Sequence, residues 1–174
     1  MRAVDAAKGA ALVFCAAIVQ VTLLSSVVLV RGTPNLVLVT LVALALLRGS
    51  VYGAAAGFAA GLVVDTATLG TLGETSLLLT LAGYWIGRYG ETTGRDRTHA
   101  PFVAVAVVTV LYEFGALFLH YMLGEAASAR AALLEALPPQ LLFNLLLTLP
   151  VYALCRRLLG PIPRGEAAEV RLLG

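Results

Sequence analysis

Apolar residues along this chain gather into six long runs, and the charged residues lie mainly between them. The runs span residues 9–30, 34–47, 50–64, 75–87, 101–123 and 139–159. An α-helix needs about 20 apolar residues to cross the hydrocarbon core of a bilayer, and a helix satisfies its own backbone hydrogen bonds there. We therefore expect an all-α integral membrane protein. Its six-helix bundle forms a single transmembrane domain over residues 1–160, followed by a cytoplasmic tail at 161–174.

The runs 34–47 and 50–64 are shorter than a full crossing requires. They either cross a locally thinned bilayer, with Arg48 reaching toward the water, or form a re-entrant hairpin entered from outside. We favour two full crossings, because a re-entrant turn would hold Arg48 near the bilayer centre at a cost of at least about 2.5 kcal/mol. The alanine-rich segment 125–138 either lies along the membrane surface or extends the last helix.

Composition supports the membrane class. Of the 174 residues, 60% are hydrophobic and 13% are charged, whereas soluble domains carry about 25% charged residues. This leaves no room for a separate soluble catalytic domain. The two cysteines, Cys15 and Cys155, lie in apolar segments, and we expect both to be reduced thiols.

The cations are distributed unevenly between the two sides of the predicted bundle. With the N-terminus inside, the outer side carries only Arg31 and Arg130. The inner side carries Arg2, Lys8, Arg48, Arg88, Arg95, Arg97, Arg156, Arg157, Arg164 and Arg171. This bias places both termini in the cytoplasm. Tyr84, Trp85 and Tyr89 fall near the inner end of the fourth run, where interfacial aromatic residues are expected.

Small residues recur every fourth position at the start of the third run. They are Gly49, Gly53, Gly57 and Gly61, and Asp65 continues the spacing. On a helix these glycines make a ridge without side chains, along which another helix can approach to backbone contact. The ridge packs either against a helix of the same bundle or against the transmembrane helix of a partner protein.

Glu113 is the most unusual polar residue, because it lies near the centre of the fifth run. An acid at this depth must be protonated or paired. Gln140 and Asn144 on the sixth run, and Gln20 on the first, are potential hydrogen-bonding partners. Glu113 is therefore either a clamp between helices or a proton or ligand site. We favour the clamp, since no second acid lies at the same depth. His120, nearer the outer surface, is expected to be an interfacial residue.

No motif for catalysis or metal binding is present. The sequence has no G-x-S-x-G, no H-E-x-x-H and no Walker loop. We expect no enzyme activity, no metal, no cofactor and no nucleic-acid partner. Asp65 and Glu74 bracket an outer loop without a cation, and they either bind a basic partner segment or are solvated.

Two regions resemble one family. A proline opens the second run, and a glycine-rich third run follows with the pattern G…G…GF..GL..D. The last run has two prolines, a central asparagine, another proline and a basic end. The matching positions are Pro34, Gly49, Gly53, Gly57, Phe58, Gly61, Leu62, Asp65, Pro138, Pro139, Asn144, Pro150, Arg156 and Arg157. This pattern resembles the MreD rod-shape-determining family.

The resemblance implies a multi-pass protein of the bacterial cytoplasmic membrane, surrounded by its lipids, within the cell-elongation machinery. Its implied partner is MreC, a bitopic coiled-coil protein, which links it to the filament MreB and to the peptidoglycan glycosyltransferase–transpeptidase pair. The implied fold is similar to that of substrate-binding subunits of energy-coupling-factor transporters.

Three hypotheses follow. The first is a non-catalytic scaffold for cell shape and peptidoglycan synthesis. In it the ridge from Gly49 to Gly61 binds an MreC-like helix, and Asp65 and the loop to Glu74 contact the helix's external extension. The second is a solute-binding transporter subunit with a midplane pocket lined by Glu113, Gln140 and Asn144. The third and weakest is an intramembrane enzyme acting on lipid-linked precursors.

Overall fold

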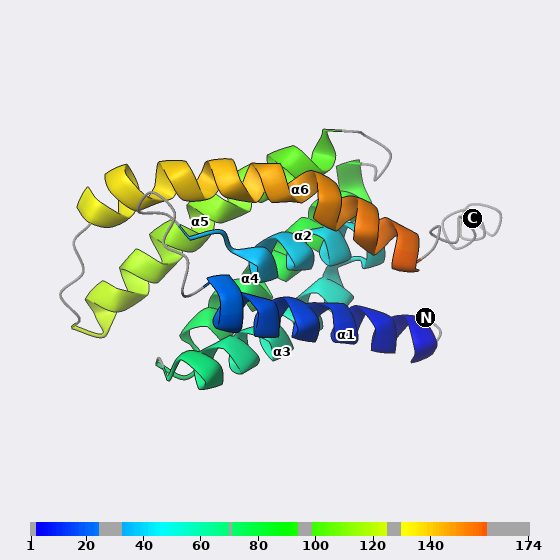
Figure 1. Ribbon diagram of the computed structural model, residues 1–174, viewed down its shortest axis with the longest axis horizontal. Coiled ribbons are helices and arrows are strands. Elements are labelled where there is room, and N and C mark those ends of the chain that lie inside the picture. The colour runs from blue at the N-terminus through cyan, green and yellow to red at the C-terminus, as the bar shows by residue number, and fades with distance from the viewer. Residues whose placement is uncertain (1–2, 25–32, 70, 94–98, 125–129, 160–174) are drawn as a thin grey trace, which may run out of the picture.

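The computed structural model describes residues 3–24, 33–69, 71–93, 99–124 and 130–159, and within them it contains helices and no strand. The α-helices are α1 (Ala3–Val19), α2 (Leu36–Arg48), α3 (Ser50–Thr68), α4 (Glu74–Thr93), α5 (Ala100–Met122) and α6 (Leu137–Leu159). Turns of π-helix at Gln20–Leu24 and Ala131–Ala136 continue α1 and precede α6. The helices lie side by side in one bundle (Figure 1).

The predicted helix number is confirmed, while two boundaries are wrong. The third and fourth helices were expected to end at residues 64 and 87, but α3 continues to Thr68 and α4 to Thr93. Asp65 and Glu91, which lie beyond the predicted ends, make contacts within the bundle, as described below. Residues 131–136 extend α6, as one of the two alternatives predicted. The end of the first predicted run, part of segment 125–138 and the tail 161–174 lie outside the described residues.

Within the described residues, three helices are long and apolar enough to cross a membrane by length and composition. They are α3, α5 and the continuous helix Ala131–Leu159. Shorter apolar stretches occupy Ala7–Thr22 and Leu36–Arg48. The second of these is α2, and its position explains why it is short.

Helix α2 lies at the centre of the bundle, in contact with all five other helices (Figure 1). Every residue from Val37 to Leu47 is buried. A helix that is apolar on every side belongs in a protein interior, because it has no face to offer to water. At about 1.5 Å per residue, its 13 residues extend only about 20 Å. This length suffices because α2 faces other helices and not lipid.

The two ends of α2 show how far it reaches. At its last residue, the Arg48 Nη2 atom donates a hydrogen bond to the carbonyl oxygen of Leu159, the last residue of α6, at 2.6 Å. Before its first residue, the Asn35 backbone amide donates to Asn144 Oδ1, near the middle of the helix formed by residues 131–159. Helix α2 therefore runs from about halfway along α6 to its end. It covers about half the length of that helix, and the full crossing by residues 34–47 stays a prediction.

Arg48 lies at an end of the bundle and not halfway along it, so the turn between α2 and α3 is not the mid-membrane turn of the re-entrant alternative. The turn is made by Gly49, whose φ of 98° falls in the left-handed region that favours glycine. The Gly49 amide also donates to the Ala45 carbonyl and caps α2 at 2.8 Å.

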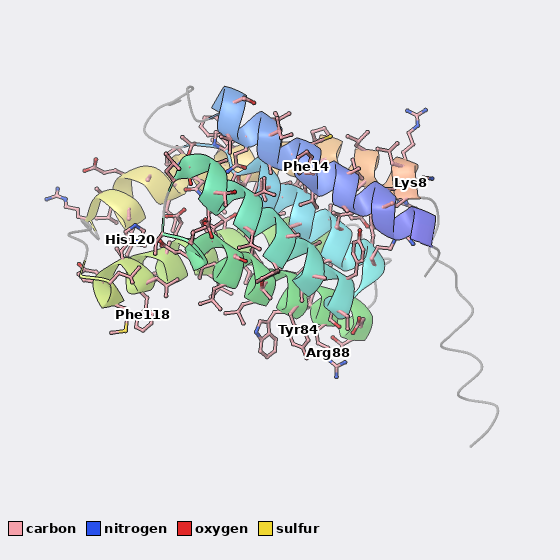
Figure 2. The ribbon with its side chains drawn as sticks, turned by 90° about the horizontal axis from the view of Figure 1, so that it is seen from below. Lys8, Phe14, Tyr84, Arg88, Phe118 and His120 are labelled. Atoms are coloured by element: carbon pink, nitrogen blue, oxygen red, sulfur yellow. The ribbon has the colours of Figure 1, made fainter. Side chains whose placement is uncertain are left out.

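Most of the described cations lie at this same end. It is where α1 begins and α6 ends (Figure 1), and where α2 turns into α3. Among the described residues, Arg130 lies at the other end, whereas the basic end carries Lys8, Arg48, Arg88, Arg156 and Arg157. Figure 2 shows Lys8 and His120 at opposite ends. The remaining cations of the predicted bias lie outside the described residues, and the cytoplasmic assignment of this basic end stays a prediction.

Candidate functional site

The glycine ridge of α3 packs against α4 of the same chain. A Cβ atom added to Gly57 would overlap the Leu79 carbonyl and lie 2.6 Å from its carbon atom. At Gly53 the added atom would lie 2.9 Å from the Gly83 carbonyl carbon, and at Gly61 it would lie 2.8 Å from that of Thr75. Real Cβ atoms do not approach backbone this closely. The ridge therefore allows two helix backbones to touch, as small residues do in membrane proteins.

Helix α4 contributes its own small residues to this contact, and our sequence analysis missed them. A Cβ on Gly83 would meet the Gly53 carbonyl, and one on Gly87 would lie 2.5 Å from the Gly49 carbonyl carbon. With Ser76 and Thr80 they form a series spaced by four, three and four residues. This spacing follows one helix face, so the signal was present in the sequence in a less regular form than on α3.

Each helix of this antiparallel pair also caps the other. The Asp65 carboxylate, near the end of α3, accepts hydrogen bonds from the backbone amides of Gly73, Thr75 and Ser76 at 2.9 to 3.3 Å. At the opposite end, the Glu91 carboxylate accepts from the Ser50 backbone amide at 2.8 Å and from its hydroxyl at 3.1 Å. Acids at helix N-termini satisfy orphan amides and complement the helix dipole.

These contacts decide where a partner helix can bind. The face that carries Gly53, Gly57 and Gly61 is filled by α4, which is the packing alternative of the sequence analysis. Asp65 is only 3% exposed and is fully engaged as a cap, so it does not reach an external extension of a partner. Gly49 forms the α2–α3 turn. This face of α3 therefore has no room for another helix.

Glu74 does not remain a free loop acid either. Its Oε1 atom lies 3.0 Å from Nδ1 of His120 and joins the start of α4 to the last turns of α5. The side chains of Tyr112 on α5 and Thr75 on α4 are also hydrogen-bonded, two helical turns before His120 on α5. Helices α4 and α5 are thus held together at the end of the bundle opposite the basic end.

The predicted polar cluster divides into two parts. Asn144, fully buried, accepts from the Asn35 amide at 2.8 Å and donates through Nδ2 to Thr109 Oγ1 at 3.1 Å. Gln20 Oε1 accepts from the Val37 amide at 2.8 Å. Asn35 itself caps the Leu38 amide at 3.0 Å. Asn144 and Gln20 therefore hold the buried start of α2 and do not pair with Glu113.

Glu113 lies against Gln140, one of the three partners considered for it from the sequence. The side chains of Gln140 and Glu113 are hydrogen-bonded, and the pair joins α5 to α6. Gln140 is buried and Glu113 is partly buried. The contact joins α5 to α6, as the clamp hypothesis expects, and the clamp stays a prediction. Asn144 is directed to Asn35 and Thr109, and the pocket predicted around Glu113, Gln140 and Asn144 also stays a prediction.

Two apolar grooves mark the membrane-facing surface. One, of about 570 Å³, lies between α1 and α3, and its lining includes Phe14 and Tyr52. The other, of about 440 Å³, lies between α4 and α5, and its lining includes Trp85 and Leu111. Figure 2 shows Phe14 toward one edge of the bundle and Tyr84 at the opposite edge, so the grooves lie on different sides.

Comparison with known proteins gives one finding. The family model described as rod shape-determining protein MreD matches residues 8–160. Neither the curated proteins nor the solved structures contain a match to the chain. The similarity to energy-coupling-factor subunits therefore stays a prediction.

The backbone contact between α3 and α4 predicts that one Gly→Ala substitution lowers the stability of the protein, whereas this change usually raises the stability of a helix. In an ordinary helix, Gly→Ala adds about 1 kcal/mol of stability. Gly57→Ala should instead lower the free energy of unfolding by about 1 to 3 kcal/mol, because the new methyl group meets the Leu79 backbone. Cys155, which is 1% exposed, provides the measurement. In a Cys15→Ala background, its reaction with a thiol-reactive dye on heating reports unfolding.

Gly115→Ala is the matched control. There the added Cβ atom meets only the Leu78 side chain, whose end can move aside. Gly115→Ala should therefore unfold at or near the wild-type temperature. Equal or higher stability of Gly57→Ala would contradict the close approach of α3 and α4.

The buried start of α2 yields a second prediction. Asn144→Ala removes the acceptor of the Asn35 amide and should lower the free energy of unfolding by about 3 kcal/mol. Leu146→Ala, a truncation on the exposed side of the same helix, should have a much smaller effect. The same thiol assay measures both. Similar losses in the two variants would show that the α2 cap contributes little.

Proposed function

Because this chain belongs to the rod shape-determining protein MreD family, we propose that it is a non-catalytic scaffold of the bacterial cell-elongation machinery. In this proposal it lies in the cytoplasmic membrane, with its basic end and both termini on the cytoplasmic side. It binds the transmembrane helix of an MreC-like bitopic partner. Through that partner it supports MreB-guided peptidoglycan synthesis and cell shape.

The observation that carries the proposal is the alanine lining of the α1–α3 groove. Its walls include Ala10, Ala11, Ala55, Ala56, Ala59 and Ala60. Helices associate in lipid mainly through van der Waals packing, and small residues allow their axes to come close. The groove therefore has the surface chemistry that a transmembrane helix needs.

The exposed surface continues along both helices beyond the groove. Phe14 and Ile18 on α1 are 51% and 45% exposed, and Phe58 and Leu62 on α3 are 53% and 36% exposed. Phe14 lines the groove, and Ile18 lies one turn further along α1, so a helix in the groove would also meet these larger side chains.

The other groove is less suitable for a helix. Its walls carry large exposed side chains, including Trp85 at 66% and Leu111 at 61%. Phe114 and Phe118 extend the same surface along α5. Bulky residues hold a neighbouring helix away from the backbone, so they give up the close packing that drives association in lipid.

The proposed absence of catalysis is supported by how the polar residues are used. Asp65 and Glu91 cap helices, Glu113 is hydrogen-bonded to Gln140, and His120 lies against Glu74. Within the described ranges, no three His, Cys, Asp or Glu residues are grouped to hold a metal ion. The four acids named here are thus engaged with other groups of the bundle.

The proposal predicts that Ala59→Leu abolishes partner binding and leaves the fold intact. Ala59 is exposed and lines the α1–α3 groove, so leucine would fill the space of the incoming helix without displacing α1 or α3. Tagged protein is purified from native membranes in mild detergent, and co-purifying chains are quantified by mass spectrometry. The wild type should recover a single-span coiled-coil protein, which Ala59→Leu should lose at unchanged thermal stability.

Ala153→Leu supplies the control, since it makes the same change at an exposed alanine of α6. It should recover the partner at the wild-type level. Equal recovery by Ala59→Leu and Ala153→Leu would remove the alanine groove from the interface. Recovery of ATPase subunits in place of the coiled-coil protein would overturn the scaffold and favour the transporter subunit.

A further inference from the structure

Helices α4 and α5 are in contact at the end of the bundle opposite the basic end. There Glu74 Oε1 lies 3.0 Å from His120 Nδ1, and the Leu78 side chain lies against Gly115. The space between them is the groove of about 440 Å³.

This groove has the length of one membrane leaflet. On α4 its lining extends from Leu78 to Tyr89, and on α5 from Val103 to Gly115. At about 1.5 Å per residue, these stretches measure about 16 and 18 Å. The hydrocarbon core is about 30 Å thick, so the groove matches about half of it. The walls are almost entirely apolar, with Leu81, Trp85 and Leu111 partly open to the outside.

A positive charge lies on α4 near the end of the groove that faces the basic end. The Arg88 side chain, 61% exposed, is one turn beyond Trp85 on the same side of α4. Tyr84 and Trp85 pack edge to face, with ring centroids 5.8 Å apart, and Figure 2 shows Tyr84 and Arg88 projecting from the same edge of the bundle. Tryptophan, tyrosine and arginine are the residues that meet lipid headgroups at the membrane surface.

Among the described residues, the charged neighbours of Arg88 leave it able to bind an anion. Glu91 Oε2 lies 3.7 Å from Arg88 Nη1, but that carboxylate also accepts the Ser50 amide. The titratable residue at the start of α5, His99, is exposed. A guanidinium has five donors in a planar fork, so the Glu91 carboxylate at 3.7 Å does not saturate it.

We propose that the α4–α5 groove binds one anionic phospholipid of the leaflet at the basic end. An acyl chain lies along the apolar groove between Leu78 and Tyr89, and Arg88 binds the headgroup phosphate. The contacts of Glu74 with His120 and of Leu78 with Gly115 limit the ligand to one leaflet. A crossing helix would need a surface of about twice this length. The proposal rests on the membrane location of the family and is independent of partner binding.

The direct test is lipid binding by the purified full-length protein. Delipidated protein is mixed with phosphatidylglycerol or phosphatidylcholine in detergent, and bound lipids are counted by native mass spectrometry. We expect one phosphatidylglycerol molecule to be retained in preference to phosphatidylcholine. Arg88→Gln should weaken the preferred binding about fivefold, the contribution of one basic residue near an anionic membrane surface.

Two variants make the outcome specific. Arg157→Gln removes another exposed cation at the basic end, on α6, and should leave the bound lipid unchanged. Val107→Trp places a large side chain at a half-exposed wall position and should reduce binding of both lipids. Folding of each variant is verified by protection of Cys155.

Three results would overturn the proposal. The first is equal binding of the two lipids by the wild type. The second is an equal loss in Arg88→Gln and Arg157→Gln, which would indicate diffuse attraction to the basic end. The third is loss of the coiled-coil partner, with unchanged lipid binding, in folded Val107→Trp, which would assign the groove to the partner helix.

Discussion

The arrangement of this bundle depends on one requirement, that the backbone amides at the start of α2 find acceptors where no water is available. Helix α2 begins about halfway along α5 and α6, and an unpaired amide at such a depth costs several kcal/mol. Asn35 supplies one acceptor from its own segment, Gln20 supplies another from the end of α1, and Asn144 supplies a third from α6. Because these acceptors come from three parts of the chain, satisfying α2 also fixes its neighbours around it.

The same requirement shapes the α3–α4 pair. The amides at the start of each helix are satisfied by an acid near the end of the other, Asp65 for α4 and Glu91 for α3. Glycines between the two caps bring the backbones into contact. The caps fix the register of the pair, and the glycines fix its spacing. These two roles explain why the glycine pattern ends in an acid. They also explain why the glycine face of α3, which looks suited to a partner helix, packs against α4 of the same chain.

The sequence was sufficient for features that depend on composition along one segment. Six helices, a basic end and a ridge able to touch another backbone all followed from local patterns, and Gln140 was one of three partners considered for Glu113. The sequence was not sufficient to predict which helices pack against each other. The pattern of ridge glycines is the same whether α4 or the helix of another protein packs on it. In the sequence, a capping carboxylate such as Asp65 cannot be distinguished from a solvated loop acid, because its partners are backbone amides whose positions depend on the fold. The short length of α2 was visible, but its cause is burial by five other helices, a property of the assembled bundle.

The two grooves then follow from what α3 and α4 leave uncovered. Each helix uses its small-residue face for the other, so its remaining faces form walls with α1 on one side and α5 on the other. Alanines on the α3 side give a wall that a helix can approach closely, whereas leucine, tryptophan and tyrosine on the α4 side give one that a flexible chain can fill. The α3–α4 pair already touches backbone to backbone, so an occupant on either side cannot compress it further. Occupants of both grooves are therefore held at a fixed separation by a wall that is two helices thick.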